Sequence, residues 1–450
     1  MPTSLIILAA GQGTRMNSDL PKVLHHVASA PLLVHAMTAG AALSPDHTVI
    51  VAGHGAEAVS KAALAHDETA RVVVQEAQLG TAHAVAQAAP LLKDVSGDAI
   101  VLYGDTPFIR PETLEAMLAA RATHAVVVLG FEARDPGRYG RLVTSGDSLD
   151  RIVEFKDASL EERAITLCNS GVICADTSTL FDLVAAVGND NASGEYYLTD
   201  IVEIARKRGL SAGVVICDEA ETMGINTRAQ LAEAEAAFQT RARAEAMENG
   251  VTLTDPDSIF FALDTVVGRD ATIAPHVIFG LGVTIESGAE IRAFCHLEGC
   301  HVSRGATVGP FARLRPGAEL AEDVHVGNFV EIKNAILDEG VKVGHLTYLG
   351  DAHVGQHTNI GAGTITCNYD GVFKHHTEIG ANVFIGSDTM LVAPVTIGAG
   401  AMTASGSVIT ADVPAEALAL GRAPQVVKPG FARKFFDRLK AQKAAKGKLS

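Results

Sequence analysis

The chain has 450 residues, contains no tryptophan, and has only 5% aromatic residues. No apolar run approaches the roughly 18 residues needed to cross a bilayer. The N-terminal segment lacks a basic stretch followed by a long apolar core, so we do not expect export. None of the six cysteines forms a CxxC pair or has the neighbouring ligands of a zinc site, which favours free buried thiols. We therefore expect a cytoplasmic protein.

The chain has little positive charge: 36 Lys and Arg stand against 52 Asp and Glu, for a net charge of −16. This balance argues against nucleic acid or an anionic membrane as the main partner. The exception is the C-terminal stretch 431–450, with seven Lys or Arg residues and one Asp. Such a basic tail is either solvated or meets an anionic ligand, and composition alone favours the solvated tail.

The first half shows the alternation of an α/β domain. Apolar residues make up 48% of the chain and charged residues 20%, as expected for a globular protein. Short β-branched runs, such as residues 48–52 and 99–103, alternate with segments of helical length up to about Asn226. This rhythm predicts a Rossmann-like domain with a mainly parallel sheet, in which ligands bind beyond the carboxyl ends of the strands.

The character of the chain changes near residue 250. Residues 227–248 are rich in Ala, Glu and Arg, carry Leu231, Ala234 and Phe238 on one face, and precede the stop signal Asn249-Gly250. This pattern predicts a linker helix. We therefore expect a first domain at 1–228, a linker helix at 229–249, and a second domain at 250–450.

In the second half an apolar residue recurs at every sixth position. The repeat includes Ile273, Phe279, Ile285, Ile291 and Leu297, then continues from Val302 after a slip of one residue. Hexads of this kind place one inward side chain on each short strand of a triangular coil. They resemble the left-handed parallel β-helix of hexapeptide-repeat proteins. The resemblance implies about nine coils over residues 251–410, followed by the basic tail, and a homotrimer.

A phosphate-binding loop is predicted near the N-terminus. The apolar run 5–8 leads into LAAGQGTRM, which contains Gly11, Gly13 and Arg15, and Lys22 follows closely. Glycines let backbone N–H groups approach phosphate oxygens, and the two cations compensate the charge of a triphosphate. The spacing fits neither GxxxxGK[ST] nor GxGxxG. The whole segment resembles the signature of sugar-1-phosphate nucleotidyltransferases, which join a sugar phosphate to the α-phosphate of an NTP and release pyrophosphate.

Two polar residues are candidates for a Mg²⁺ site. Asp105 closes an apolar run in YGDTP, and Asn226 lies in GINTR. An Asp at a strand end can simply cap a turn, but Mg²⁺ in phosphoryl transfer takes one or two protein oxygens. The resemblance implies that both residues are metal ligands. It also implies that Arg15 and Lys22 are catalytic, stabilising charge as the sugar phosphate attacks the α-phosphorus in line.

Further motifs resemble the uracil and sugar pockets of the enzymes that make UDP-N-acetylglucosamine. Gln75 and the turn 78–81 match the uracil-reading segment, since an amide can both donate and accept. Gly140, Glu154, Asn169 and the run GEYYLTD match the sugar pocket. The residues implied to bind UTP or its product are Leu8, Ala9, Ala10, Gly11, Lys22, Gln75, Gly80, Thr81, Tyr103, Gly104, Asp105, Gly140, Glu154, Asn169 and Asn226.

A second site is predicted in the second half. GHLTYLGD, which contains His345, is expected to interrupt the repeat, and NIGAGTITCNYDG is expected to loop out beside it. Together these segments resemble the acetyltransferase half of the bifunctional N-acetylglucosamine-1-phosphate uridyltransferase and glucosamine-1-phosphate acetyltransferase family, and the resemblance covers essentially the whole chain. It implies that His345 is a general base. It also implies glucosamine-1-phosphate contacts at Arg315, Lys333, Tyr348 and Asn359, and acetyl-CoA contacts at Ala362, Asn368, Tyr369, Ser387, Ser405 and Arg422.

The sequence therefore predicts a bifunctional enzyme that acetylates glucosamine-1-phosphate with acetyl-CoA and then transfers uridylyl from UTP. The products are UDP-N-acetylglucosamine, for cell-wall and lipopolysaccharide synthesis, and pyrophosphate. One alternative is a nucleotidyltransferase whose β-helix only trimerises or regulates; relatives of that kind lack the GHLTYLGD and TCNYDG pair. Another is a non-catalytic sugar-nucleotide sensor, against which Lys22, Asp105 and His345 together argue.

Overall fold

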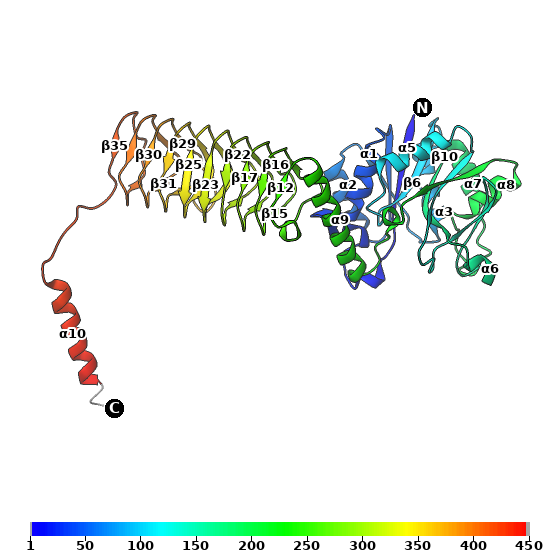
Figure 1. The fold of residues 1–450 in the computed structure, drawn as a ribbon, viewed down its shortest axis with the longest axis horizontal. Helices are drawn as coiled ribbons and strands as arrows, with labels where there is room; N and C mark the ends of the chain where they lie inside the picture. Colours follow the sequence, from blue (N-terminus) through cyan, green and yellow to red (C-terminus); the bar gives the residue numbers. More distant parts are fainter. Residues whose placement is uncertain (1, 447–450) are drawn as a thin grey trace. The chain divides into compact units, whose positions relative to one another are not determined.

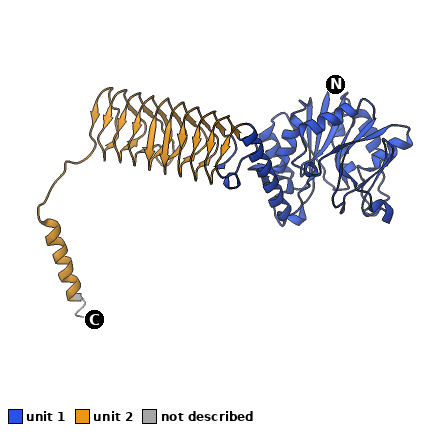
Figure 2. Ribbon diagram, viewed as in Figure 1, with its two compact units in different colours: residues 1–249, 255–265, 278–282 blue, residues 250–254, 266–277, 283–450 orange. Residues whose placement is uncertain are grey.

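The structure, a computed structural model, describes residues 2–446. Two compact units are distinguished in Figure 2. The first comprises the residues up to 249 together with 255–265 and 278–282, and the second comprises the remaining residues. None of the helices in the described part of the chain is both long and apolar enough to cross a membrane.

The first unit is built on a mixed sheet of nine strands with the central order β11-β7-β10-β6-β1-β4-β5. The pairs of β1 with β4 and β6, of β4 with β5, and of β7 with β11 are parallel. Only β10 runs antiparallel to its neighbours on this path, and the hairpin β8–β9 is attached to it. The strands are β1 Thr3–Ala9, β4 His47–Ala52, β5 Arg71–Val74, β6 Asp98–Tyr103, β7 Val126–Glu132, β8 Arg141–Ser145, β9 Ser148–Val153, β10 Leu167–Asp176 and β11 Ala212–Cys217. The prediction of a mainly parallel sheet is confirmed.

Helices cover both faces of this sheet (Figure 1). Alternate residues of β1 enter two separate cores: Ile6 and Leu8 belong to one, Leu5 and Ile7 to the other. The first core includes α3 Thr81–Ala86, α4 Ala89–Leu92, α7 Thr177–Val184 and α8 Asp200–Lys207, and the second includes α1 Leu32–Ala41, α2 Ala56–His66 and α5 Pro111–Ala120. Because both faces are covered, the central strands are continuously apolar and only their ends are open to solvent.

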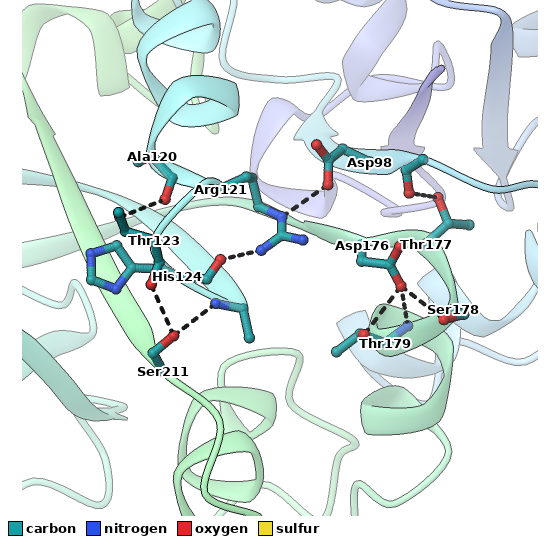
Figure 3. Close-up of polar contacts among 12 residues, drawn as sticks. Asp98, Ala120, Arg121, Thr123, His124, Asp176, Thr177, Ser178, Thr179 and Ser211 are labelled. Atoms are coloured by element: carbon teal, nitrogen blue, oxygen red, sulfur yellow. Dashed lines mark hydrogen bonds and ion pairs between the residues drawn. The ribbon is translucent and has the colours of Figure 1, made fainter. Parts of the chain in front are cut away.

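The amino ends of the parallel strands form a purely structural edge, drawn in Figure 3. Arg121 Nε donates to Asp98 Oδ1 at 3.0 Å, where β6 begins. Ser211 Oγ accepts from the backbone N–H of Ala125 at 3.1 Å, which ties the starts of β7 and β11 together. Asp176 caps α7 by accepting from the backbone N–H of Thr179 at 3.0 Å. These groups satisfy one another, which leaves the opposite edge, at the carboxyl ends, for ligands.

A helix is present where the linker helix was predicted, α9 Arg228–Glu248, and it belongs to the first unit. Thr227 is its N-cap, and its side chain accepts a hydrogen bond from the backbone N–H of Gln230 at 3.2 Å. The helix buries Ala234, Phe238 and Gln239.

Two short 3-10 helices also belong near the site, η1 Thr14–Met16 and η2 Lys22–Leu24. The first unit further contains α6 Leu160–Arg163, η3 Glu219–Thr222, η4 Pro256–Ser258 and the small hairpin β2 His26–Val27 and β3 Ala30–Pro31.

The second unit is a parallel β-helix. One face is a ten-stranded parallel sheet with the order β12-β14-β17-β20-β23-β25-β27-β30-β33-β35. Its strands are β12 Thr252–Leu253, β14 Thr272–Ile273, β17 Glu290–Ile291, β20 Thr307–Val308, β23 His325–Asn328, β25 Lys342–His345, β27 Asn359–Ile360, β30 Phe384–Ile385, β33 Met402–Thr403 and β35 Leu418–Ala419. The other two faces include β13 Val266–Val267, β16 Thr284–Ile285, β19 Cys300–Val302, β21 Arg313–Leu314, β22 Ala318–Leu320, β24 Glu331–Leu337, β26 Tyr348–Val354, β28 Ile365–Cys367, β29 Thr377–Ile379, β31 Met390–Val392, β32 Val395–Ile397 and β34 Val408–Ile409.

The hexad residues form the inner core of this β-helix, as predicted. Ile273, Ile291, Val308, Val326 and Val343 pair in sequence along the first face, and all are fully buried. Each coil needs only one large inward residue per face, because six residues of chain span one side of the triangle. The side chains between them point outward and are available for other uses.

One expectation about the second half is wrong. The segments around His345 and Asn359 do not leave the repeat, because β25, β26 and β27 continue the ladders in register. Residues 365–367 likewise pair with β26 and β31. Only residues 368–376 project as a loop, closed by a bridge between Tyr369 and Lys374. The predicted interruption reflects small and polar residues at positions where the backbone still follows the coil.

The C-terminal stretch contains a helix, α10 Phe431–Lys446. Its bounds cover most of the predicted basic tail, of which residues 447–450 lie outside the described part. Phe435, Phe436 and Leu439 are exposed along it.

Gln239 links α9 to the segment 255–265 of the first unit. Its side chain is 2% exposed, Nε2 donates to the carbonyl oxygen of Phe261 at 2.7 Å, and Oε1 accepts from the Phe261 N–H at 2.8 Å. We expect Gln239→Leu to lower the free energy of unfolding by about 2–4 kcal/mol, because two buried backbone groups lose their partners. Urea denaturation measures this, with Thr240→Ala as an exposed control that should change by less than about 0.5 kcal/mol. Equal effects of the two variants would contradict the assignment.

Candidate active sites

The predicted phosphate loop closes over Lys22. It follows β1 directly, and Gly13 has φ = 61°, a left-handed conformation that favours glycine. A Cβ at Gly13 would lie 2.5 Å from Cβ of Lys22. Glycine is therefore required at this position both for the backbone conformation and for the close approach of η2, which begins with Lys22.

The loop forms one wall of a cavity of about 270 Å³ at the carboxyl ends of the strands. Ten of the predicted UTP-binding residues line it, namely Leu8, Ala9, Ala10, Gly11, Lys22, Gln75, Gly80, Thr81, Tyr103 and Asp105. Val23, Gln78, Ala84 and Glu195 complete the lining. The structure thus brings together four segments that are far apart in the sequence.

Lys22 is held between the two predicted metal ligands. Its ammonium forms an ion pair with the Asp105 carboxylate and donates to Asn226 Oδ1 at 3.0 Å. A backbone hydrogen bond also joins the segments of Asp105 and Asn226, because the N–H of Ile225 donates to the carbonyl oxygen of Asp105 at 3.0 Å. One carboxylate and one amide oxygen within reach of a single cation fit Mg²⁺, which keeps several waters and takes few protein ligands. Within residues 2–446, no group of three or more His, Cys, Asp or Glu is arranged to hold a metal.

The predicted uracil segment is fixed by its own hydrogen bonds. Gly80 has φ = 121°, and a Cβ there would lie 2.5 Å from the carbonyl oxygen of Tyr196. The Tyr196 backbone pairs with both sides of this turn, donating to Leu79 O and accepting from Ala82 N, each at 2.9 Å. The GEYYLTD run therefore supports the turn that carries Gly80 and Thr81, a role that its sequence did not reveal.

Tyr103 joins the nucleotide cavity to the predicted sugar residues. Burial raises its pKa, and the nearby charges of Glu154 and Asp105 raise it further. Burial also raises the pKa of Glu154, although the hydroxyl of Thr199, which donates to Oε1 at 3.2 Å, opposes this. Asn169 lies beside the same carboxylate, because its N–H donates to Gly140 O at 2.9 Å, and a Cβ at Gly140 would be 3.4 Å from Glu154 Oε1.

Several predicted residues do not line the cavity. Gly104 lies behind it, with its N–H donating to Leu8 O at 3.0 Å. Gly140, Glu154 and Asn169 do not line it either, although the charge of Glu154 acts on Tyr103. Arg15 lies in η1 with an exposed side chain and does not reach the cavity.

Four of the predicted acetyltransferase residues follow one edge of the β-helix. Val343, Ile360, Ile385 and Thr403 are register partners on successive coils. Two places after them come His345, Ala362, Ser387 and Ser405. Arg422 lies beside the end of this column, where its Nη1 donates to the Ser405 carbonyl oxygen at 2.7 Å. Four sequence segments are therefore aligned by the register alone.

His345 is oriented by a neighbour that sequence reasoning missed. Its Nδ1 lies 2.7 Å from Oδ1 of Asn328, its register partner on the preceding coil. Because an amide oxygen only accepts, Nδ1 carries the proton and Nε2 keeps its lone pair. The exposed Nε2 can then act as a base. The repeat could have identified Asn328, since it occupies the position of His345 one coil earlier.

The predicted cations lie at the next edge of the coil. Arg315 pairs with Glu331 at 2.8 Å, which raises its pKa. Lys333 is the register partner of Gly350 on β26. The pKa of Lys333 is lowered because the ammonium of Lys374 lies beside it, with Arg315 adding to the effect. Lys374 belongs to the projecting loop, and no sequence signal links it to Lys333.

Asn368 and Tyr348 complete this edge. Asn368 Nδ2 donates to Asp351 Oδ2, and Asn334 Nδ2 donates to Oδ1 of the same carboxylate at 2.6 Å. A Cβ at Gly350 would collide with the phenol oxygen of Tyr348. Tyr369 lies on the loop with an exposed ring, and Asn359 lies on β27.

The two halves match two protein-family models. Residues 5–165 match the MobA-like NTP transferase domain. Residues 376–411 match the six-repeat bacterial transferase hexapeptide family. The fold and the two family matches thus define a nucleotidyltransferase domain followed along the chain by a left-handed β-helix transferase domain.

Full-length relatives identify the family. The chain is 77% identical to the bifunctional protein GlmU of Cereibacter sphaeroides, over 99% of this chain and 98% of that protein. It is 67% identical to the GlmU of Paracoccus denitrificans, over 98% of this chain and 99% of that protein. It is 66% identical to the GlmU of Roseobacter denitrificans, over 99% of each chain. The chain belongs to the family of the bifunctional protein GlmU. The predicted bifunctional enzyme, a nucleotidyltransferase and an acetyltransferase in one chain, is confirmed.

Gly13 provides a test of the phosphate loop. We expect Gly13→Ala to lower uridyl transfer at least tenfold, because a Cβ forces Lys22 away from Asp105, and to cost about 1–2 kcal/mol in stability from the left-handed φ. Pyrophosphate release and thermal unfolding measure the two effects. Gly188→Ala is the matched control, since a Cβ there meets nothing within 4 Å. Unchanged activity in Gly13→Ala would show that the loop does not position Lys22.

Proposed function

We propose that UTP binds in the cavity beneath the glycine loop and that uridyl transfer takes place there. The observation that carries the proposal is the convergence of ten predicted residues on one cavity, with Lys22 between Asp105 and Asn226. Gln75 and the Gly80 turn face the uracil. Gly140, Glu154 and Asn169 hold N-acetylglucosamine-1-phosphate on the other side of Tyr103.

The chemistry needs no covalent enzyme intermediate. A phosphate oxygen of the sugar phosphate attacks the α-phosphorus of UTP in line, and pyrophosphate leaves with the electron pair of the broken P–O bond. Lys22 and Arg15 stabilise the negative charge that develops on the phosphoryl oxygens and on pyrophosphate. Asp105 and Asn226 would hold Mg²⁺, which when bound neutralises phosphate charge as a Lewis acid. Arg15 serves this role by turning inward from η1.

For the second reaction we propose that His345 is the general base. Asn328 fixes the ring so that Nε2 takes the proton as the amine of glucosamine-1-phosphate attacks the thioester carbonyl of acetyl-CoA. The amide bond forms, the C–S bond breaks, and the proton passes to the departing CoA sulfur. Lys333, Arg315 and Lys374 together provide the positive charge that a sugar phosphate requires. The column from Ala362 to Arg422 holds acetyl-CoA.

We further propose that the acetyltransferase is a homotrimer with sites shared between copies. Within one copy, Gly350, the register partner of Lys333, lies five positions after His345, and the chain turns a corner of the coil between them. The amine and the phosphate of glucosamine-1-phosphate are on adjacent carbons of one sugar. We infer that a second copy, packed alongside this edge, brings its own base next to these cations.

These assignments imply a division of labour along the chain. We propose a uridyltransferase domain at 1–228, a linker helix at 229–249 and an acetyltransferase domain at 250–450. The product of the second domain is the substrate of the first. A cytoplasmic enzyme of this kind would supply UDP-N-acetylglucosamine for cell-wall and lipopolysaccharide synthesis.

Asp105→Asn tests the metal site. We expect it to lower uridyl transfer at least a hundredfold, because loss of the carboxylate weakens Mg²⁺ binding and removes charge stabilisation. Acetyl transfer, carried by the other half, should stay within twofold of wild type. Pyrophosphate release and free-thiol release measure the two reactions. A variant that releases pyrophosphate at the wild-type rate in saturating Mg²⁺ would refute the assignment.

His345→Ala and Lys333→Ala test the base and the shared site together. Each variant alone should lose acetyl transfer by about 10²- to 10⁴-fold, as expected for loss of a general base or a phosphate anchor. Co-expressed in equal amounts, they should recover about a quarter of wild-type activity. This is because one site in four of a randomly mixed trimer pairs an intact His345 with an intact Lys333.

Free-thiol release from acetyl-CoA measures this recovery, and light scattering gives the oligomeric state. Uridyl transfer should be unaffected in both variants. No recovery from mixed trimers would place both residues in one copy, and activity of His345→Ala within threefold of wild type would exclude His345 as the base.

A further inference from the structure

Gln75 lines the UTP cavity, and its amide is held by Gly80, which also lines the cavity, and by His83, which does not. The residue is only 3% exposed. Its Nε2 donates to the carbonyl oxygen of Gly80 at 3.1 Å and lies 2.9 Å from Nδ1 of His83. His83 is on the first turn of α3, which begins directly after Gly80. His83 is not among the residues that the sequence implies for either reaction.

These two contacts fix the orientation of the amide. The nitrogen must face Gly80, since two oxygens at this distance would repel each other. An amide nitrogen has two hydrogens, and Gly80 O and His83 Nδ1 account for both. The side-chain oxygen of Gln75, Oε1, accepts no hydrogen bond from any residue in the described range, so it is the atom left for a ligand in the cavity.

The tautomer of His83 follows from the same geometry. Nδ1 accepts from Gln75, so it carries no proton, and the ring proton is on Nε2. Gln87 also approaches the ring, with its Nε2 3.2 Å from His83 Nε2. That amide nitrogen already donates to the backbone carbonyl of His83 at 3.0 Å. A neutral imidazole has only one accepting nitrogen, and the shorter contact, from Gln75 at 2.9 Å, assigns that nitrogen to Nδ1. The protonated Nε2 then accepts no hydrogen bond from Gln87.

We propose that His83 is a positioning residue that sets the specificity for uracil over cytosine by locking the amide of Gln75 with its oxygen toward the base. The N3 atom of uracil carries a proton and donates, whereas N3 of cytosine has a lone pair and accepts. An oxygen held in place therefore attracts uracil and repels cytosine. This proposal rests on the binding of UTP in the cavity.

The lock matters because an unconstrained amide would remove the discrimination. Glutamine can rotate by 180° and present its NH₂ group, which matches cytosine as well as the oxygen matches uracil. Gly80 alone provides one constraint on this rotation, and His83 provides the second. Loss of the imidazole acceptor should weaken selection while leaving the phosphate and sugar contacts in place.

The experiment compares kcat/KM for UTP and CTP in uridyl or cytidyl transfer to N-acetylglucosamine-1-phosphate, using the full chain. His83→Phe keeps an aromatic ring but removes the acceptor, and we expect the UTP/CTP ratio to fall about 10- to 100-fold. His83→Asn can present Oδ1 where Nδ1 was and should restore most of the ratio. Gln87→Met removes the neighbour that does not bond to the ring, and its ratio should stay within twofold of wild type.

The outcomes separate this proposal from the one on which it rests. If wild type uses neither nucleotide, the assignment of the cavity fails. If wild type prefers UTP and His83→Phe keeps the preference within twofold, the role of His83 is refuted and the cavity assignment stands. Acetyl transfer by the same preparations reports folding of the other half. Should His83→Phe be inactive in both reactions, calorimetric binding of UTP and CTP to His83→Asn and His83→Ala decides, and equal ratios in the two variants overturn the proposal.

Discussion

The ammonium of Lys22 between Asp105 and Asn226 is the contact on which the geometry of the first candidate site depends. It joins three segments separated by 83 and 204 residues. Each segment is also held by a backbone or capping bond of its own, such as Asn226 N–H to Gln230 Oε1 at 2.9 Å. A lysine that is largely removed from water destabilises the fold unless its charge is paired and hydrogen-bonded. The pairing therefore favours the one arrangement of the three loops in which these groups meet. The cavity beneath the glycine loop depends on this arrangement of the three loops.

The β-helix achieves alignment by a different constraint. Its inward residues pair coil by coil, and every outward position inherits that register. Asn328, His345, Ala362 and Ser387 share a column because Val326, Val343, Ile360 and Ile385 do. Precision here comes from strands rather than from loops, and a shift of one residue would turn each of these side chains to the other face of its strand. The register of the buried core residues therefore fixes the positions of the candidate site residues.

The sequence predicted the fold well because both patterns are periodic. The hexads and the βαβ alternation are local signals, and the structure confirms the parallel sheet, the helix α9 and the coils. The apolar repeat is least regular between Ile332 and Ile379, where buried threonines occupy some inward positions. Thr366 replaces an aliphatic residue and exchanges hydrogen bonds with Gly350, accepting from its N–H at 2.8 Å and donating to its carbonyl at 3.1 Å. An insertion of residues 368–376 further lengthens that coil.

The candidate site residues were predictable only where a motif carried them. Gln75 and His345 belong to recognisable segments, but their partners His83 and Asn328 do not, because a partner is defined by distance rather than by spacing. Lys374 is the extreme case, since it reaches Lys333 only through the fold of a projecting loop. Asn328 could be found in retrospect from the period of the β-helix, whereas no period relates His83 to Gln75. Local sequence patterns thus identify the candidate site residues, and the tertiary structure supplies the neighbours that fix their orientation.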